Sequence, residues 1–91
     1  MLKLQVTGQF RKDYKFAKKR GMNMKLLEAV ILELQQENPL ADKYRDHALV
    51  GNYAGFRECH IQPNWLLIYS IDHGNLILTA SRTGTHADLF G

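Results

Sequence analysis

Residues 65–71, WLLIYSI, form an almost uninterrupted apolar run. A run of this length and composition is typical of a strand that is buried on both faces and lies in the middle of a sheet. Pro63-Asn64 predicts a turn before this strand, and Asp72-His73-Gly74-Asn75 predicts a hairpin turn after it. We therefore expect residues 54–61 and 76–82 to flank the central strand in an antiparallel meander.

The N-terminal half predicts one strand followed by two helices. Residues 2–7, LKLQVT, alternate apolar and polar side chains, which is the pattern of a half-buried strand, and Gly8 breaks it. Residues 9–20 and 24–36 carry apolar side chains at helical spacing, and the short link between them predicts an antiparallel hairpin. Residues 40–52 mix charges with isolated apolar side chains and are expected to form a loop.

Together these segments predict the order β-α-α-β-β-β. This order indicates an α+β fold in which a helical hairpin packs on one face of a small antiparallel sheet. The other face is then open, and the side chains on it decide what the protein does. A chain of 91 residues has room for one core, so we expect a single domain over residues 1–91.

Composition excludes several classes of protein. Cys59 is the one cysteine, which rules out an internal disulfide framework and four-cysteine zinc sites. No apolar run approaches the length that spans a bilayer, so no membrane partner is expected. The N-terminus lacks the long apolar segment of a signal peptide, and we therefore expect a cytoplasmic protein.

Positive charge is concentrated in the N-terminal half. Residues 1–45 carry ten Lys and Arg against five Asp and Glu, a net +5, whereas residues 46–91 carry two against four, a net −2. This surface is either a solvated helix face or a binding face for a polyanion such as RNA or DNA. The second predicted helix is too apolar to read a DNA groove, so the sequence does not favour a DNA-binding regulator. The basic residues of the first predicted helix that lie off its apolar side are Lys12, Lys15, Lys18 and Lys19.

The predicted strand AGFRECHI places a carboxylate beside an imidazole. Glu58 and His60 share one face of such a strand, whereas Arg57 and Cys59 take the other. Arg82, at the end of the last strand, offers a donor fork that suits phosphate. These groups suit metal-free RNA cleavage, in which a base deprotonates the 2′-hydroxyl, a cation stabilises the phosphorane and an acid protonates the leaving 5′-oxygen.

Three sequence elements extend this pattern along the chain, after Phe10-Arg11-Lys12-Asp13 at the start of the first helix. They are His47-x-Leu49-x-Gly51, Arg57-Glu58-x-His60-x-x-Pro63-x-Trp65 and Arg82-x-Gly84-Thr85-His86-x-x-Leu89-Phe90. In this order and spacing the chain resembles the YafQ branch of the RelE superfamily, which are toxins of type II toxin–antitoxin modules. The resemblance implies an endoribonuclease that cleaves mRNA in the ribosomal A site and so inhibits translation, with no cofactor. It also implies a DinJ-like antitoxin as partner, with operator DNA bound only through the antitoxin complex.

The resemblance also implies roles for individual residues. His86 would be the general acid, and Arg82 would stabilise the transition-state charge. Trp65 and Phe90 fall where the family shapes the site and holds the C-terminus. The remaining members of the catalytic cluster would be His47, His60 and Glu58, the last of these orienting or assisting a histidine.

Asn64 departs from the family pattern, which has Asp or Glu between the proline and the tryptophan. An amide cannot act as a general base. His60 or Glu58 would then take that role, or activity would be reduced. The departure therefore leaves a second function open: a catalytically weakened RelE-fold protein that binds the ribosome or an antitoxin.

Several residues allow a structural interpretation beside the functional one. Arg57 is either a phosphate clamp or a structural ion-pair former, and Trp65 either stacks on a base or packs in the core. Cys59 is expected to be a small core residue rather than a nucleophile, because a buried thiol is not activated. His73 lies in a turn and is expected to have no role. The histidines lack the close spacing of a local metal site, and the lysine-rich helix is either solvated or bound to the ribosomal RNA backbone.

Overall fold

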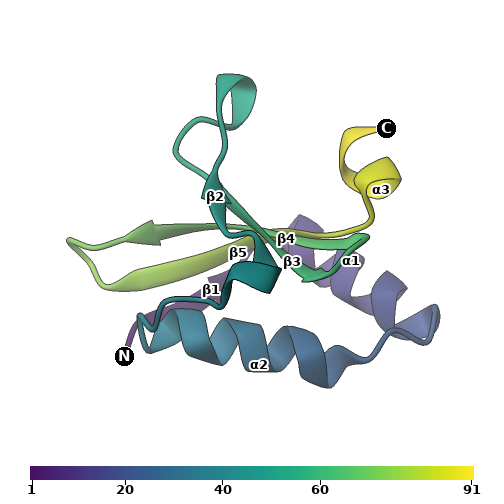
Figure 1. Cartoon of the computed structure of the whole chain (residues 1–91), viewed down its shortest axis with the longest axis horizontal. Coiled ribbons are helices and arrows are strands. Elements are labelled where there is room, and N and C mark those ends of the chain that lie inside the picture. The colour runs from purple at the N-terminus through teal and green to yellow at the C-terminus, as the bar shows by residue number, and fades with distance from the viewer.

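The computed structural model describes all 91 residues as a five-stranded sheet with two long helices on one face (Figure 1). On the other face, α3 and the segment that carries β2 and η2 project away from the sheet. The strands are β1 (Lys3–Val6), β2 (His47–Ala48), β3 (Arg57–Gln62), β4 (Trp65–Asp72) and β5 (Ile77–Gly84). The helices are α1 (Gly8–Lys19), α2 (Met24–Gln35) and α3 (His86–Phe90), with 3₁₀ turns η1 (Asp42–Tyr44) and η2 (Gly51–Tyr53).

The strand order is β1-β5-β4-β3-β2, so the WLLIYSI segment lies in the middle of the sheet as predicted. β3, β4 and β5 form the expected antiparallel meander, and β2 extends it beyond β3. β1 pairs with β5 in parallel, so the sheet is mixed and not wholly antiparallel. The reason is that β1 joins the sheet through the last strand, to which no short turn connects it. The α+β fold and the helical hairpin are confirmed.

Both long helices begin at side-chain caps. Thr7 accepts a hydrogen bond from the backbone of Phe10 at 3.0 Å, so the helix already begins at Gly8. Asn23 caps α2 by accepting from the backbone of Lys25 at 3.2 Å. Gly21, with a φ of +80°, takes the left-handed conformation that separates the two helices. None of the helices has the length and apolar composition that crossing a membrane requires.

The sheet has an apolar layer on each face. Trp65, Leu67 and Tyr69 point to the helices and join the main core, while Leu66 and Ile68 point to the opposite face. A smaller cluster forms on that opposite face around Leu66 and Ile68 and includes Leu49, Tyr53, Phe56 and Leu89. This second layer joins the bases of the two projecting segments to the sheet through their apolar side chains.

The segment 40–52 holds more structure than the sequence predicts. It contains η1, the two-residue strand β2 and the start of η2, and β2 pairs with β3. A strand of two residues is too short to show periodicity, and its pairing depends on a partner farther along the chain. The expected loop is therefore wrong at β2, which brings His47 into the sheet.

Candidate active site

A carboxylate and two imidazoles meet on the open face of the sheet. β3 directs Glu58 and His60 to this face, as the alternation predicts, and the pairing of β2 with β3 sets His47 directly opposite Glu58. Glu58 is 5% exposed. Its Oε1 lies 3.6 Å from Nε2 of His47 and 3.7 Å from Nε2 of His60. One buried carboxylate oxygen therefore lies within ion-pair distance of two imidazole rings.

Backbone carbonyls fix the orientation of both rings. Nδ1 of His47 lies 2.6 Å from the carbonyl oxygen of Arg45, and Nδ1 of His60 lies 3.2 Å from that of Pro63. A carbonyl only accepts, so each Nδ1 carries a proton and donates it. Each Nε2 is consequently the atom that faces Glu58 and has no carbonyl partner.

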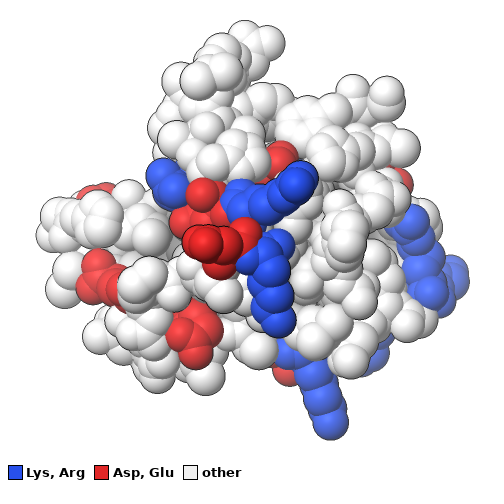
Figure 2. Space-filling model, viewed as in Figure 1, with Lys and Arg blue, Asp and Glu red and all other residues white.

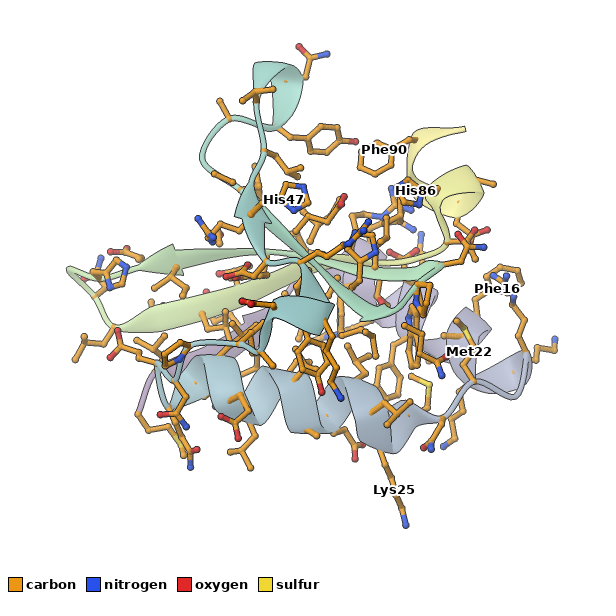
Figure 3. The ribbon with its side chains drawn as sticks, viewed as in Figure 1. Phe16, Met22, Lys25, His47, His86 and Phe90 are labelled. Carbon is orange, nitrogen blue, oxygen red and sulfur yellow. The ribbon has the colours of Figure 1, made fainter.

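His86 approaches the same cluster from the first turn of α3 (Figure 3). Its ring centroid lies 6.0 Å from that of His60 and 6.1 Å from that of Phe90. Tyr53 packs edge-on against Phe90, at 5.5 Å between centroids, so the segment carrying η2 meets α3 above the sheet. The sequence does not single out Tyr53, because no chemical motif marks an aromatic edge contact.

Polar contacts hold α3 in place. Thr85 and Asp88 form a reciprocal capping box, in which each side chain accepts from the other's backbone at 3.1 and 2.9 Å. Arg20, from the end of α1, donates to Asp88 at 2.8 Å. The backbone hydrogen bond from Thr85 and then the Arg20 contact lower the pKa of Asp88 from its ordinary value. Gly84 is required here because an added Cβ would lie 3.0 Å from the Asp88 side chain.

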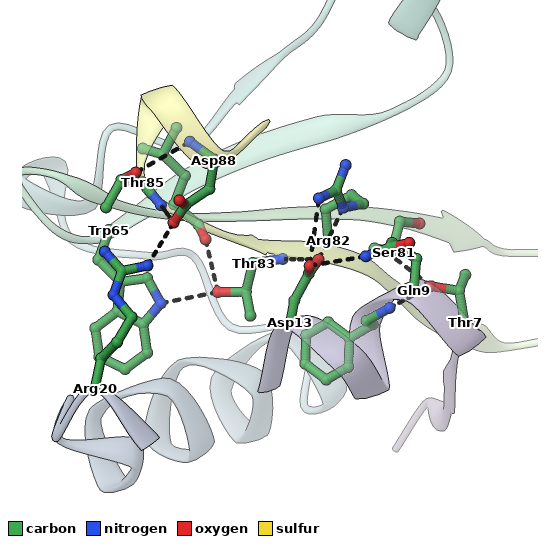
Figure 4. Close-up of polar contacts among 12 residues, drawn as sticks. Thr7, Gln9, Asp13, Arg20, Trp65, Ser81, Arg82, Thr83, Thr85 and Asp88 are labelled. Atoms are coloured by element: carbon green, nitrogen blue, oxygen red, sulfur yellow. Dashed lines mark hydrogen bonds and ion pairs between the residues drawn. The ribbon is translucent and has the colours of Figure 1, made fainter. Parts of the chain in front are cut away.

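Arg82 is anchored by an aspartate to which the sequence pattern assigns no role (Figure 4). Asp13 on α1 accepts from Nε of Arg82 at 2.8 Å and from Nη2 at 3.3 Å, and also from the backbone of Thr83. The side-chain hydrogen bond to Asp13 raises the pKa of Arg82, which stays charged. Nη1 of Arg82 makes no hydrogen bond within the chain. The one signal in the sequence is the position of Asp13 in the Phe10-Arg11-Lys12-Asp13 element.

Trp65 and Arg57 do not line this site. Trp65 is 1% exposed and points to the helices, where its indole donates to the hydroxyl of Thr83 at 2.9 Å. Arg57 binds Asp46 on the helical side of the sheet, with Nη2 3.2 Å from Oδ2, and Tyr69 also donates to Asp46. The structure brings neither side chain to the histidine cluster, since strand alternation turns them away from Glu58 and His60. The structural alternatives, core packing and an ion pair, are confirmed.

Three other predictions concern residues near the sheet. Cys59 is fully buried in the main core, and burial raises the pKa of its thiol to about 12, which confirms a structural role. His73 is exposed, with Nδ1 3.5 Å from Glu37. Asn64 is exposed in the β3–β4 turn, next to the Pro63 carbonyl that holds His60, and its side chain makes no hydrogen bond. Asn64 therefore stays a candidate for contact with a ligand.

The lysines of α1 are exposed and lie on the helical side of the sheet, away from the histidine cluster. They do not contribute to the site itself, so any binding role belongs to a separate surface. No group of three or more His, Cys, Asp or Glu side chains is arranged to hold a metal ion.

The site thus combines a buried carboxylate, three imidazoles and an anchored guanidinium. His47, His60 and His86 supply imidazole rings that can carry protons, and Arg82 supplies positive charge from the last strand. Groups of this kind can remove a proton from one oxygen and deliver a proton to another within one substrate. The face is open, so an extended strand has access to it.

Comparisons with known proteins identify a matching family and several similar proteins. Residues 2–91 match the family model described as the bacterial toxin of type II toxin–antitoxin system, YafQ. The chain is 42% identical over 89 residues to the mRNA interferase toxin YafQ of Escherichia coli K12, covering 97% of this chain and 95% of that protein. It is similar to the toxin in the crystal structure of the E. coli DinJ–YafQ complex, with a TM-score of 0.90, 39% identity and full coverage of both chains. It is also similar to a metal-bound toxin from Helicobacter pylori, with a TM-score of 0.93, 43% identity and coverage of 99% and 100%.

Proposed function

The chain belongs to the YafQ family of bacterial toxins from type II toxin–antitoxin systems, and from this premise we propose that it is an endoribonuclease that cleaves ribosome-bound mRNA. The observation that carries the proposal is the sharing of the buried Glu58 carboxylate by His47 and His60, with His86 beside them. These side chains project from three separate elements onto the open face of the sheet. Simple packing does not account for a buried carboxylate in contact with two imidazoles there.

The reaction begins with removal of a proton from the 2′-hydroxyl by Nε2 of His60 or by Glu58. The 2′-oxygen then attacks the adjacent phosphorus, the P–O5′ bond breaks, and a 2′,3′-cyclic phosphate forms. His86 donates the proton that the leaving 5′-oxygen takes up. A positioned acid or base of this kind contributes about 10²- to 10⁴-fold in rate.

Arg82 stabilises the negative charge that develops on the phosphorane. Asp13 holds Nε and Nη2, so Nη1 is the donor that remains for a phosphate oxygen. His47 is about half exposed, with its Nδ1 fixed by the Arg45 carbonyl. It assists His60 by sharing Glu58 and adds positive charge when protonated.

The proposed reaction needs no metal ion, since acid, base and cation are all supplied by side chains. One of the similar structures is of a metal-bound toxin from H. pylori, so dependence on metal has to be measured for this chain. Cleavage by protein treated with EDTA, at the rate of untreated protein, is the expected result. Loss of cleavage that zinc or copper restores would overturn this part of the proposal.

The proposed partners follow from the same family. The E. coli relative forms a complex with DinJ, and we propose a DinJ-like antitoxin for this chain. Operator DNA would be bound only through that complex. The ribosome would supply the alignment of a flexible mRNA strand that one small open face lacks.

Primer extension on mRNA tests the proposal directly. Wild-type protein and His86→Ala are each added to a translating extract and to the same mRNA without ribosomes. We expect cuts within codons in the extract, weak cutting of naked mRNA, and no cuts with His86→Ala. A folded His86→Ala protein that cuts at the wild-type rate would remove the enzymatic assignment.

A further inference from the structure

Two basic side chains beside the histidine cluster have no acidic partner. Lys43 lies in η1 and Arg45 follows that turn directly, and both are exposed. Neither forms an ion pair, whereas Arg57, Arg82 and Arg20 each bind an aspartate. Basic and acidic side chains lie side by side in the middle of the face shown in Figure 2. The Lys43 ammonium lies 5.1 Å from the centroid of the Tyr44 ring, and no carboxylate pairs with Lys43 or Arg45, so both charges are available to a ligand.

These side chains line a cavity together with a member of the cluster. A cavity of about 270 Å³ is bounded by Lys43, Arg45, His60 and Pro63. The lining thus combines the cationic side chains of Lys43 and Arg45 with the His60 imidazole. A phosphate oxygen bound here would lie next to the group that reacts at the scissile phosphodiester.

A second cavity adjoins the first and has a different character. It measures about 370 Å³ and shares Lys43, His60 and Pro63 with the first. Its other walls include the apolar side chains of Leu26 and Ile61 and the ring of Tyr44. An apolar and aromatic surface next to a cationic one suits a nucleotide, whose base stacks while its phosphate is bound by charge.

The backbone of Arg45 links this surface to the cluster. Arg45 has a φ of +49°, a left-handed conformation that is rare for a residue with a side chain. In this conformation its carbonyl accepts from Nδ1 of His47, while its side chain lines the cavity beside His60. The same residue therefore fixes one catalytic ring and presents a charge next to the other.

We infer that Lys43 and Arg45 form a subsite for the backbone phosphate next to the scissile one, with the flanking base of single-stranded RNA in the adjoining cavity. This inference rests on the proposed function, because it assumes that His60 faces the scissile phosphate. Lys43 and Arg45 are positioning residues in this assignment. They align the strand and do not exchange protons with it.

The test uses an RNA that cannot be cut. A 2′-O-methylated RNA pentanucleotide is titrated into ¹⁵N-labelled full-length protein, with amide shifts as the readout and the titration repeated at several salt concentrations. The double variant Lys43→Gln/Arg45→Gln is compared with Lys3→Gln/Lys25→Gln, which loses the same charge at exposed positions outside both cavities. The amide spectrum also reports whether each variant is folded.

We expect shifts at Lys43, Arg45 and His60 and a Kd about tenfold higher for Lys43→Gln/Arg45→Gln than for the control. The slope of log Kd against log salt should fall by about 0.7 for each phosphate that the variant no longer binds. On ribosome-bound mRNA the double variant should raise KM more than it lowers kcat.

Three results would overturn the inference: no binding by wild type, shifts confined to other surfaces, or a double variant with the control's Kd and slope. Loss of antitoxin binding with unchanged RNA binding would assign the surface to a protein partner instead. If wild type binds the pentanucleotide at Lys43 and Arg45 but does not cleave mRNA, the phosphate-binding site stands, whereas the proposed function and the position of that site next to a scissile phosphate fail. If wild type cleaves and the double variant cleaves and binds like the control, the proposed function stands and the subsite fails.

Discussion

Asp13 on α1 accepts two hydrogen bonds from Arg82 on β5, although the two residues lie 69 positions apart in the sequence. The same carboxylate accepts from the backbone of Thr83. The contact therefore joins the helical layer to the end of β5, shortly before α3 begins at His86. The direction of the Arg82 side chain therefore depends on α1, whose C-terminal Arg20 also binds Asp88 of α3.

Asp13→Asn should lower the cleavage rate without unfolding the protein. The amide keeps the size of the carboxylate but loses its charge, so the guanidinium is held less firmly and transition-state charge is stabilised less well. We expect kcat to fall about tenfold, with KM nearly unchanged, in a ribosome-dependent cleavage assay. Asp42→Asn is the matched control, since Asp42 is exposed and forms no ion pair. An equal loss in both variants would show that Asp13 does not act through Arg82.

Trp65→Phe should affect stability and not RNA binding. The change removes the indole hydrogen bond to Thr83 and leaves space in the main core. The free energy of unfolding should fall by about 2 kcal/mol in urea titrations. The Kd for the 2′-O-methylated pentanucleotide should stay at the wild-type value. A higher Kd with an unchanged free energy of unfolding would show that Trp65 contacts the substrate.

The sequence predicts the fold well where the pattern is long and local. The apolar run of β4, the alternation of β1 and the helical spacing of α1 and α2 all depend on neighbours within a few positions, and all four elements form where expected. The sequence does not indicate β2, because two residues show no period and their pairing partner lies beyond the η2 turn. The parallel pairing of β1 with β5 likewise depends on contacts across the whole chain.

The site was predictable in its chemistry but not in its geometry. Alternation alone places Glu58 and His60 together, and the structure confirms this. The family resemblance added His47 and His86, which come from other elements. Neither the alternation nor the resemblance predicted that Trp65 lies outside the histidine cluster. A motif gives the position of a residue and does not say whether its side chain contacts substrate. Contacts such as Asp13 to Arg82 exist only once helix and sheet have packed together.

Replacing the four lysines of α1 should weaken ribosome binding. Glutamine at Lys12, Lys15, Lys18 and Lys19 removes exposed charge from a face that packs against nothing. If each lysine contacts one phosphate, the salt slope should fall by about 0.7–0.9 per residue, and the fold should persist. Sedimentation with ribosomes at several salt concentrations measures this. An unchanged slope would show that the helix is a solvated face.

Acid should loosen α3 before it unfolds the sheet. The pKa of Asp88 is lowered in the folded protein, so its contribution to stability is present above its ordinary pKa of 3.8 and is lost as the pH falls through the lower, folded value. Protonation breaks the Arg20 contact and the capping box with Thr85. The amide signals of residues 86–90 should broaden first in a pH titration. Asp88→Asn should show the same change at neutral pH, and an ordered α3 in that variant would contradict this coupling.

Asn64→Asp tests what the departure from the family pattern does. Asn64 is exposed beside the Pro63 carbonyl that holds His60, so a carboxylate there has room to reach a substrate. If a carboxylate at this position is the better base, Asn64→Asp should raise the cleavage rate several-fold and shift the acid limb of the pH–rate profile. If His60 or Glu58 already serves as base, the new charge should leave the rate unchanged or lower it by holding a histidine protonated. We expect the second outcome, because Glu58 already faces Nε2 of both His47 and His60 at 3.6–3.7 Å. Single-turnover cleavage across the acid and alkaline limbs of the profile distinguishes the two, and a several-fold faster variant would remove Glu58 and His60 as the principal base.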